Sequence, residues 1–253
     1  MIYFANPKSE YLYLKNKIHR KISDVLNSNS YILGNEVKKF EKNFSKYLGI
    51  RYSLGVSNGT DALILALKAI DIKQGDEVIT TSHTAFATIA AIREVGATPV
   101  FIDIKEDDFT IDARYLKKKI TKKTRAIIIV HIYGNPADIL AVQKIAKKKK
   151  LILIEDCAQA HGAEYNKKKV GTFGDFSCFS FYPTKNLSTF GDAGMVSTNN
   201  HKLFKRLKLT REYGWIKKNL SVRDGYNKRL DELHAAILNI KLSYLEKFNN
   251  KRI

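Results

Sequence analysis

A single lysine, Lys185, stands apart from the other lysines of this chain. Elsewhere lysines occur in runs, as at residues 117–119 and 147–150, and such runs are typical of solvated faces because a buried ammonium ion without a partner is costly. Lys185 lies instead in CFSFYPTKNLSTFGDAG, residues 178–194, among aromatic residues and glycines. Partial desolvation there would lower the pKa of the amine and make it a nucleophile. The alternative is an ordinary exposed lysine in a loop between two strands.

The stretch SNGTD, residues 57–61, is a candidate phosphate site. It follows a predicted strand and opens a predicted helix, so a glycine turn, a hydroxyl group and free backbone N–H groups meet at a helix N-terminus. Serine and threonine before a helix often serve only as caps, which is the alternative. The stretch is neither a Walker loop nor a dinucleotide-binding fingerprint, because it lacks the Gly-Lys-Ser/Thr sequence and the further glycines that these require.

The stretch LILIEDCAQAHGA, residues 151–163, combines a buried strand with polar residues beyond its end. Asp156 lies where the strand leaves the sheet, a suitable place for a carboxylate that holds a ring nitrogen in its protonated form. His161 could act as a general base, but we favour a structural loop histidine. A metal site is disfavoured because Glu155, Asp156 and His161 do not share one helical face.

These three stretches together match the needs of one cofactor. Pyridoxal phosphate requires a phosphate site, a carboxylate facing its pyridinium nitrogen, and an amine for its aldehyde. The isolated Lys185 is explained if its amine forms the bond to that aldehyde.

Short apolar runs alternate along the chain with helical patterns. The runs predict strands at residues 52–56, 77–80, 98–102, 125–130, 151–155, 176–181 and 195–198. The patterns between them predict helices at residues 61–70, 84–95, 112–120 and 136–149, and an earlier amphipathic helix over 37–47 ends at Gly49. This alternation predicts an α/β fold with a mostly parallel sheet and helices on both faces, in which ligands bind beyond the carboxyl ends of the strands.

Composition limits the class of protein. With 253 residues, of which 44% are hydrophobic, the chain can form one large globular domain. It has no run of about 18 apolar residues and no signal peptide at its start, so we expect a cytoplasmic protein. Cys157 and Cys178 show no metal-ligand spacing and are expected to be reduced and buried.

The formal net charge of +19 would suit a protein that binds nucleic acid or an anionic membrane. The lysines are scattered over many segments, however, and no nucleic-acid recognition motif concentrates them. We therefore interpret most of the charge as background composition, with a remaining field that favours phosphorylated, anionic small molecules.

At these same stretches the sequence resembles a known family. The segments GTDALILAL, GDEVITTSHTAFAT, GATPVFIDI, HIYGNPADI, EDCAQAHGA, SFYPTKNLSTFGDAGMV and GYNKRLDELHAAIL are similar, in order, to the DegT/DnrJ/EryC1/StrS family of sugar aminotransferases. The resemblance covers essentially the whole chain. It implies the aspartate aminotransferase type of fold (fold type I), pyridoxal 5'-phosphate as cofactor, and a homodimer with active sites at the subunit interface.

The resemblance also implies roles for individual residues. Lys185 looks like the Schiff-base lysine, Asp156 like the partner of the pyridine nitrogen, and Gln159 like the contact to the 3-hydroxyl side of the ring. Asn227 would reach the phosphate of the neighbouring subunit's cofactor. Three residues would hold the phosphate within the subunit: Gly59, Thr60 and Ser180.

Two features depart from the family pattern. The aromatic residue that usually stacks on the cofactor ring is replaced by Ala85, and His83 or Phe86 could substitute for it. The last segment, residues 229–253, predicts one long helix that runs to the final residue without a glycine or proline stop. Family members continue into a smaller C-terminal domain, so we expect residues 1–253 to form the cofactor-binding large domain of a truncated gene product, a split-gene half or an engineered fragment.

The function implied by the resemblance is transfer of an amino group from glutamate to a nucleotide-linked keto-6-deoxy-sugar, in the biosynthesis of surface-polysaccharide amino sugars. The segments SHTAFAT, residues 82–88, and REYGW, residues 211–215, are most similar to those of the branch acting on dTDP-3-keto-6-deoxyhexoses. Three alternatives remain. They are a cofactor-dependent sugar 3-dehydrase, in which a histidine would replace Lys185, a truncated and inactive chain that acts only as a partner subunit, and a nucleic-acid binder.

Overall fold

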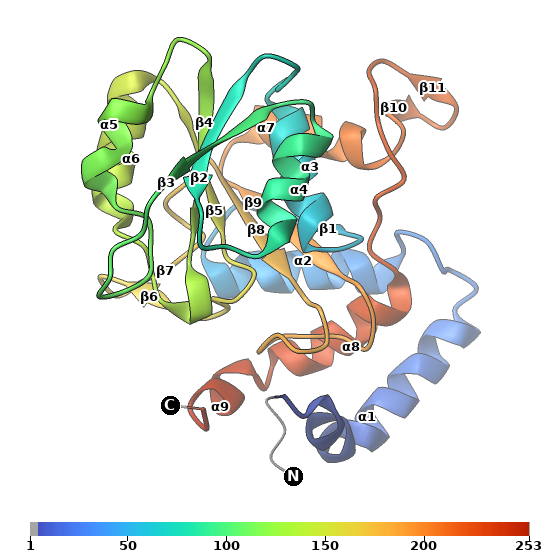
Figure 1. Ribbon diagram of the computed structural model, residues 1–253. Coiled ribbons are helices and arrows are strands. Elements are labelled where there is room, and N and C mark those ends of the chain that lie inside the picture. Colours follow the sequence, from blue (N-terminus) through green and yellow to red (C-terminus); the bar gives the residue numbers. More distant parts are fainter. Residues whose placement is uncertain (1–4, 253) are drawn as a thin grey trace.

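A seven-stranded sheet forms the centre of the molecule, in the order β1-β9-β8-β5-β4-β2-β3 (Figure 1). The computed structural model describes residues 5–252. The strands are β1 (Tyr52–Val56), β2 (Glu77–Thr81), β3 (Thr98–Ile102), β4 (Thr124–Val130), β5 (Ile152–Asp156), β8 (Phe176–Ser180) and β9 (Gly194–Thr198). Strand β9 is antiparallel to both of its neighbours, and the other pairs are parallel. The predicted mostly parallel sheet is confirmed.

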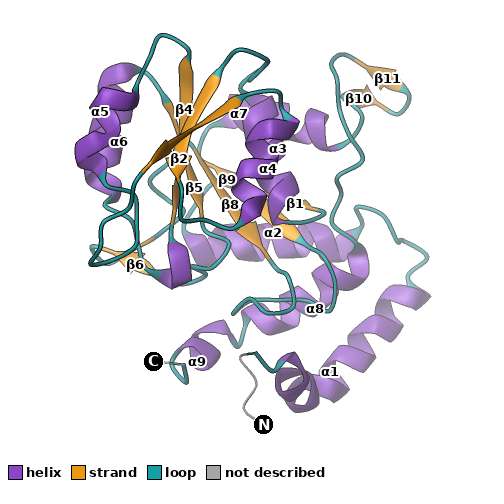
Figure 2. Ribbon diagram, viewed as in Figure 1, coloured by secondary structure: helices purple, strands orange, loops and turns teal. Residues whose placement is uncertain are grey.

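Helices cover both faces of this sheet (Figure 2). One face packs against α2 (Asn35–Leu48), α5 (Leu116–Lys119), α6 (Ile139–Lys149) and α8 (Glu232–Leu242). The other packs against α3 (Gly59–Ala69), α4 (Phe86–Glu94) and α7 (His201–Arg211). The central parallel strands β4 and β5 are buried on both sides, which explains their nearly continuous apolar runs in the sequence, whereas the edge strand β3 is partly exposed.

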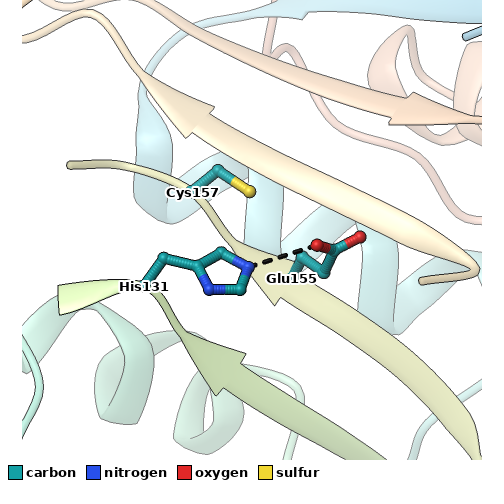
Figure 3. Close-up of side chains that lie close together, drawn as sticks. All are labelled: His131, Glu155 and Cys157. Carbon is teal, nitrogen blue, oxygen red and sulfur yellow. Dashed lines mark hydrogen bonds and ion pairs between the residues drawn. The ribbon is translucent and has the colours of Figure 1, made fainter. Parts of the chain in front are cut away.

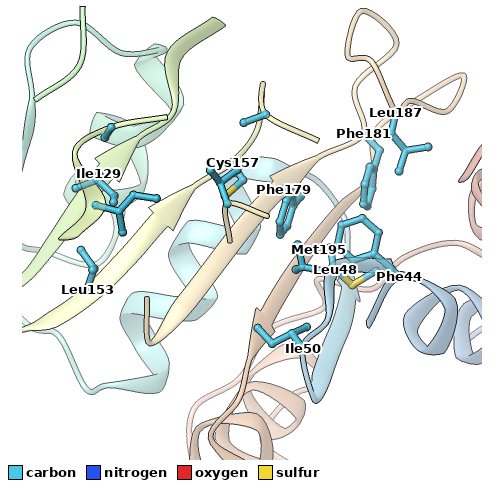
Figure 4. Close-up of a cluster of buried hydrophobic side chains, with 14 of the residues drawn as sticks. Phe44, Leu48, Ile50, Ile129, Leu153, Cys157, Phe179, Phe181, Leu187 and Met195 are labelled. Carbon is cyan, nitrogen blue, oxygen red and sulfur yellow. The ribbon is translucent and has the colours of Figure 1, made fainter. Parts of the chain in front are cut away.

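An aromatic cluster lies between α2 and the sheet (Figure 4). The ring of Phe44 lies edge-on to those of Phe179 and Phe181, with centroids 4.9 and 5.6 Å away. All three side chains are almost fully buried, and each contributes about 2 kcal/mol of burial free energy. Phe179, in β8, and Phe181, directly after β8, therefore anchor the chain before the loop that carries Lys185.

Several helix boundaries differ from the predicted ones. The predicted helix over 112–120 is a 3₁₀ turn (Ala113–Tyr115) followed by the short α5. Helix α6 begins at Ile139 rather than at residue 136, because the Asp138 side chain accepts a hydrogen bond from the Ala141 N–H and caps the helix there.

The prediction of one long helix over 229–253 is wrong. Helix α8 ends at Leu242 and a short helix, α9 (Leu245–Asn249), follows. The Ser243 hydroxyl donates to the Ile240 carbonyl at 2.7 Å, and the Ser243 N–H bonds to that same carbonyl, so the last turn tightens and the helix stops. Residue 253 lies outside the described residues.

The sequence did not predict the first helix, α1 (Pro7–Asn27), or the short hairpins. Asn6 caps α1, and Leu14 and Ile18 pack against Ile237 of α8. The hairpins are β6 (Glu164–Tyr165) with β7 (Lys168–Lys169), and β10 (Trp215–Lys217) with β11 (Leu220–Ser221). Among the described helices, none is both long and apolar enough to cross a membrane.

Candidate active site

A cavity of about 450 Å³ opens where the carboxyl ends of β1, β4 and β5 meet the ends of β2 and β8. Six of the seven predicted site residues line it, and they come from three separate stretches of sequence: Gly59, Thr60, Asp156, Gln159, Ser180 and Lys185. The three stretches therefore meet beyond the strand ends, where ligands are expected to bind in this type of fold.

The first turn of α3 forms one wall of the cavity. Asn58 is its N-cap, and the Asn58 side chain accepts a hydrogen bond from the Asp61 N–H at 2.8 Å. Gly59 is required by close packing, because a Cβ atom there would lie 2.6 Å from the Cβ atom of Ser180. The first amide groups of a helix have no partner within the helix and carry partial positive charge. Gly59, Thr60 and Ser180 therefore frame a place that suits an anion.

Asp156 is the last residue of β5, and only 6% of it is exposed. Its carboxylate accepts hydrogen bonds from the Thr88 hydroxyl at 2.9 Å and from the Ala158 N–H at 3.1 Å. Burial raises the pKa of Asp156, although these two donors and the charges of His131 and Lys185 oppose the shift. A cationic group in the cavity would therefore stabilise the ionised carboxylate.

Lys185 lies in the loop after β8, where its backbone N–H bonds to the Tyr182 carbonyl at 2.9 Å. The residue is half-buried, and burial lowers the pKa of its amine against the opposing charge of Asp156. The expectation of a partly desolvated lysine is confirmed. A lower pKa increases the fraction of neutral, nucleophilic amine near pH 7.

Gln159 is held by the loop that follows β4. Its side-chain oxygen accepts a hydrogen bond from the Tyr133 N–H at 2.8 Å, which leaves the amide NH₂ group available as a donor. Tyr133 adopts a left-handed conformation with φ of 56°, and such backbone strain is common at binding sites. Gln159 can therefore donate to an oxygen atom inside the cavity.

His161 lies beneath the lysine loop. Its Nδ1 atom is 2.8 Å from the Asn186 side-chain oxygen, and its ring packs 5.6 and 5.5 Å from those of Phe179 and Phe181. Burial lowers the pKa of His161 to about 4. A neutral, buried imidazole with these contacts supports the structural interpretation over a general base.

Ala85 lines the cavity, as the position of the missing aromatic residue requires. The His83 ring instead faces Tyr133, with its Nε2 atom 3.3 Å from the Tyr133 hydroxyl, and Phe86 is 80% exposed. Within the described part of the chain, neither of these two suggested substitutes belongs to the cavity lining, whereas Tyr182 does.

A buried trio that the sequence did not reveal lies beside the cavity: His131, Glu155 and Cys157 (Figure 3). The Nε2 atom of His131 is 3.2 Å from Glu155, and its Nδ1 atom accepts from the Ala137 N–H at 3.1 Å. Three backbone N–H groups of residues 171–174 donate to the Glu155 carboxylate at 2.7 to 2.8 Å.

These contacts indicate a structural role for the trio rather than a metal centre. Burial alone would raise the pKa of Glu155, but His131 and the backbone N–H groups hold it below its usual range. Both carboxylate oxygens are already used, and burial raises the pKa of the Cys157 thiol well above its usual value, so the thiol stays protonated. A metal ion would need the thiolate and free carboxylate lone pairs.

Asn227 is the one predicted site residue that lies away from the cavity. It is exposed and pairs with Glu212 in an isolated β-bridge. The next residue, Lys228, forms an ion pair with Asp61, which lies in the first turn of α3 and lines the cavity.

Comparison with known proteins agrees with this geometry. The sequence profile of the DegT/DnrJ/EryC1/StrS aminotransferase family matches residues 13–253. A relative from Aneurinibacillus thermoaerophilus, named dTDP-3-amino-3,6-dideoxy-alpha-D-galactopyranose transaminase, is 48% identical over 252 residues, which are 100% of this chain and 69% of the relative.

Solved structures are also similar. DesV from S. venezuelae in complex with a ketimine intermediate superposes with a TM-score of 0.97 at 42% identity, over 99% of this chain and 68% of that one. The ntda protein from Bacillus subtilis, with bound cofactor PMP, gives a TM-score of 0.88 at 33% identity, over 92% and 53%. The predicted aspartate aminotransferase type of fold is confirmed.

The chain spans about two thirds of the length of the curated relatives it matches. The shares of the first three relatives are 69%, 65% and 66%.

Proposed function

Because the chain belongs to the DegT/DnrJ/EryC1/StrS aminotransferase family, we propose that it binds pyridoxal 5'-phosphate and transfers an amino group to a nucleotide-linked keto-sugar. The observation that carries this proposal is the shared cavity of the half-buried Lys185, the buried Asp156 and the N-terminus of α3. Bound there, pyridoxal phosphate supplies an aldehyde that takes up an amino group and a ring that accepts electrons.

The residues of the cavity fit this group. The first turn of α3 and Ser180 would bind the phosphate, and Gln159 would donate to the oxygen beside the aldehyde. Asp156 would hold a proton on the ring nitrogen, because the buried carboxylate needs a cationic partner. Lys185 would carry the cofactor covalently through Nζ and, once released, move a proton as a general base and then a general acid.

We propose a dTDP-3-keto-6-deoxyhexose as the sugar substrate and glutamate as the amino donor. The relative from Aneurinibacillus thermoaerophilus is named a transaminase of a dTDP-3-amino-3,6-dideoxy sugar and is 48% identical to this chain. A sugar diphosphate also suits a protein with a net charge of +19, whose field raises the local concentration of anions. The product would serve the biosynthesis of surface-polysaccharide amino sugars in the cytoplasm.

We further propose that the protein acts as a homodimer. Asn227 is exposed on its own subunit, which leaves its side chain available to the cofactor phosphate of a second copy. The presence of Lys185 disfavours a 3-dehydrase, in which a histidine would occupy that position.

Turnover tests this proposal directly. The purified chain is incubated with pyridoxal phosphate, glutamate and a panel of dTDP- and UDP-linked keto-sugars, and amino-sugar formation is followed by mass spectrometry. We expect amination of a dTDP-3-keto sugar and none with a Lys185→Ala variant. If the chain binds the cofactor but aminates no sugar, the alternative of an inactive partner subunit replaces this proposal.

A further inference from the structure

The proposed phosphate cradle contains a carboxylate. Asp61, in the first turn of α3, lines the cavity together with Gly59 and Thr60. Its carboxylate accepts hydrogen bonds from the Ser57 hydroxyl and, at 3.1 Å, from the Asn58 amide. These bonds fix the turn between β1 and α3, but a bare negative charge at this place would repel a bound phosphate.

Lys228 compensates that charge. Its Nζ atom donates to the second carboxylate oxygen of Asp61 across 167 positions of sequence, and the side chains are only 19% and 12% exposed. The ammonium group also lies 5.4 Å from the centroid of the Tyr226 ring. Partial burial strengthens this ion pair relative to one at the surface.

The backbone holds Lys228 in place. Its N–H donates to the Arg211 carbonyl at 3.1 Å, and the Tyr226 N–H donates to the Thr210 carbonyl at 2.8 Å. Both carbonyls belong to the last turn of α7, which packs on the same face of the sheet as α3. These backbone bonds fix residues 226–228 against α7 and so hold Lys228 beside Asp61.

We propose that Lys228 is a positioning residue for the cofactor phosphate, which acts by neutralising Asp61 at the N-terminus of α3. The proposal rests on the proposed function, since it takes the phosphate of pyridoxal phosphate as the ligand. Asp61 keeps the turn in shape, and Lys228 makes its charge compatible with a phosphate dianion. The lysine itself need not touch the phosphate.

A double-mutant cycle separates neutralisation from direct contact. Lys228→Met, Asp61→Asn and the double variant are compared with the unmodified chain by absorbance titration with pyridoxal phosphate and, as a ligand without phosphate, pyridoxal. Lys228→Met should weaken binding of pyridoxal phosphate about ten-fold and leave pyridoxal binding within about two-fold. The double variant should return to within about three-fold of the unmodified chain, because no charge is left to neutralise.

Two further variants serve as controls. Lys228→Arg retains the positive charge and should bind pyridoxal phosphate like the unmodified chain. Lys148→Met removes one charge from the exposed end of α6 and should change nothing. Circular dichroism and urea unfolding of every variant separate a loss of phosphate binding from a loss of fold.

Inorganic phosphate gives a readout independent of the proposed function. Phosphate should raise the melting temperature of the unmodified chain above its value in chloride of equal ionic strength, Lys228→Met should lose this shift, and the double variant should regain it. If the chain shows this pattern but does not bind pyridoxal phosphate, the proposed function fails and only the neutralisation of Asp61 by Lys228 at a general phosphate site stands. Unchanged binding in Lys228→Met, no rescue in the double variant, or no phosphate response in the unmodified chain would each overturn the role of Lys228.

Discussion

Glu155 and Asp156 are neighbours on β5, yet their carboxylates have opposite surroundings. Both are buried, and because successive strand residues point to opposite faces, they serve different parts of the molecule. Glu155 is bonded to His131 and to three backbone N–H groups, which lower its pKa, whereas Asp156 has two donors and a pKa raised by burial. A fully satisfied carboxylate stabilises the fold, and an under-satisfied one that faces a cavity is prepared for a ligand.

Removal of the Glu155 carboxylate should give the largest loss of stability. Glu155→Gln keeps the shape but removes the charge, and its NH₂ group replaces one of the two carboxylate oxygens. Either His131 and Gly171, or Phe173 and Gly174, therefore lose their acceptor. We expect the free energy of unfolding, measured in urea, to fall by about 3 to 5 kcal/mol. A loss below about 1 kcal/mol would remove the contrast between the two carboxylates.

Removal of the Asp156 carboxylate should lower turnover and leave the fold intact. Asp156→Asn removes a carboxyl group whose ionised form is already disfavoured by burial. The free energy of unfolding should therefore change by less than about 1 kcal/mol. Turnover of the cofactor-loaded protein should fall at least about 100-fold, because a neutral amide cannot stabilise a cationic ring. Full turnover in this variant would contradict the role of Asp156.

His161, like Glu155, is a buried group with a structural role, and it predicts that the stability of the fold depends on pH. Its pKa is 6.5 in a model peptide and about 4 in the folded chain, so the folded state resists protonation. The stability that it contributes is complete above pH 6.5 and is lost as the pH falls toward 4. At pH 5 the loss should be about 2 kcal/mol.

Urea unfolding between pH 7 and pH 5 measures this loss. A His161→Gln variant, which can keep a hydrogen bond to Asn186, should lose less stability over the same interval. Equal pH dependence in the two proteins would show that His161 does not remain neutral in the fold.

We expect the smallest effect from removal of the Thr88 hydroxyl, one of the two donors to the Asp156 carboxylate. Thr88→Val removes the hydroxyl that donates to this carboxylate at 2.9 Å and should raise its pKa further. We expect turnover at neutral pH to fall about ten-fold, which corresponds to about 1.4 kcal/mol. The acidic limb of the pH profile should move to higher pH, and a shift to lower pH would be inconsistent with the assignment.

The sequence predicts those parts of the site that depend on local pattern. Apolar runs with polar residues at their ends predicted the sheet and the edge at which Asp156 and Lys185 meet. Contacts set by packing were not predictable. His131 reaches Glu155 only because β4 and β5 pair in a register that places Val130 beside Asp156. Lys228 reaches Asp61 from a segment that no local pattern connects to α3.

The wrong prediction of one long helix over 229–253 and the failure to predict α1 have a similar physical origin. The end of α8 at Leu242 depends on a serine hydroxyl that competes for a helix carbonyl, and the apolar spacing continues past it. Helix α1 is rich in lysine and tyrosine and buries only a narrow stripe against α8. Its apolar pattern is therefore weak when taken alone.

The central claim is that one amine, at Lys185, carries a cofactor opposite Asp156. The most direct test is to mix the chain with an equimolar amount of pyridoxal phosphate, reduce the mixture with borohydride, and map the modified lysines by digestion and mass spectrometry. We predict one dominant modification, at Lys185, and its loss in a Lys185→Ala variant. Modification spread over the exposed runs at residues 117–119 and 147–150, with Lys185 unmodified, would contradict the claim.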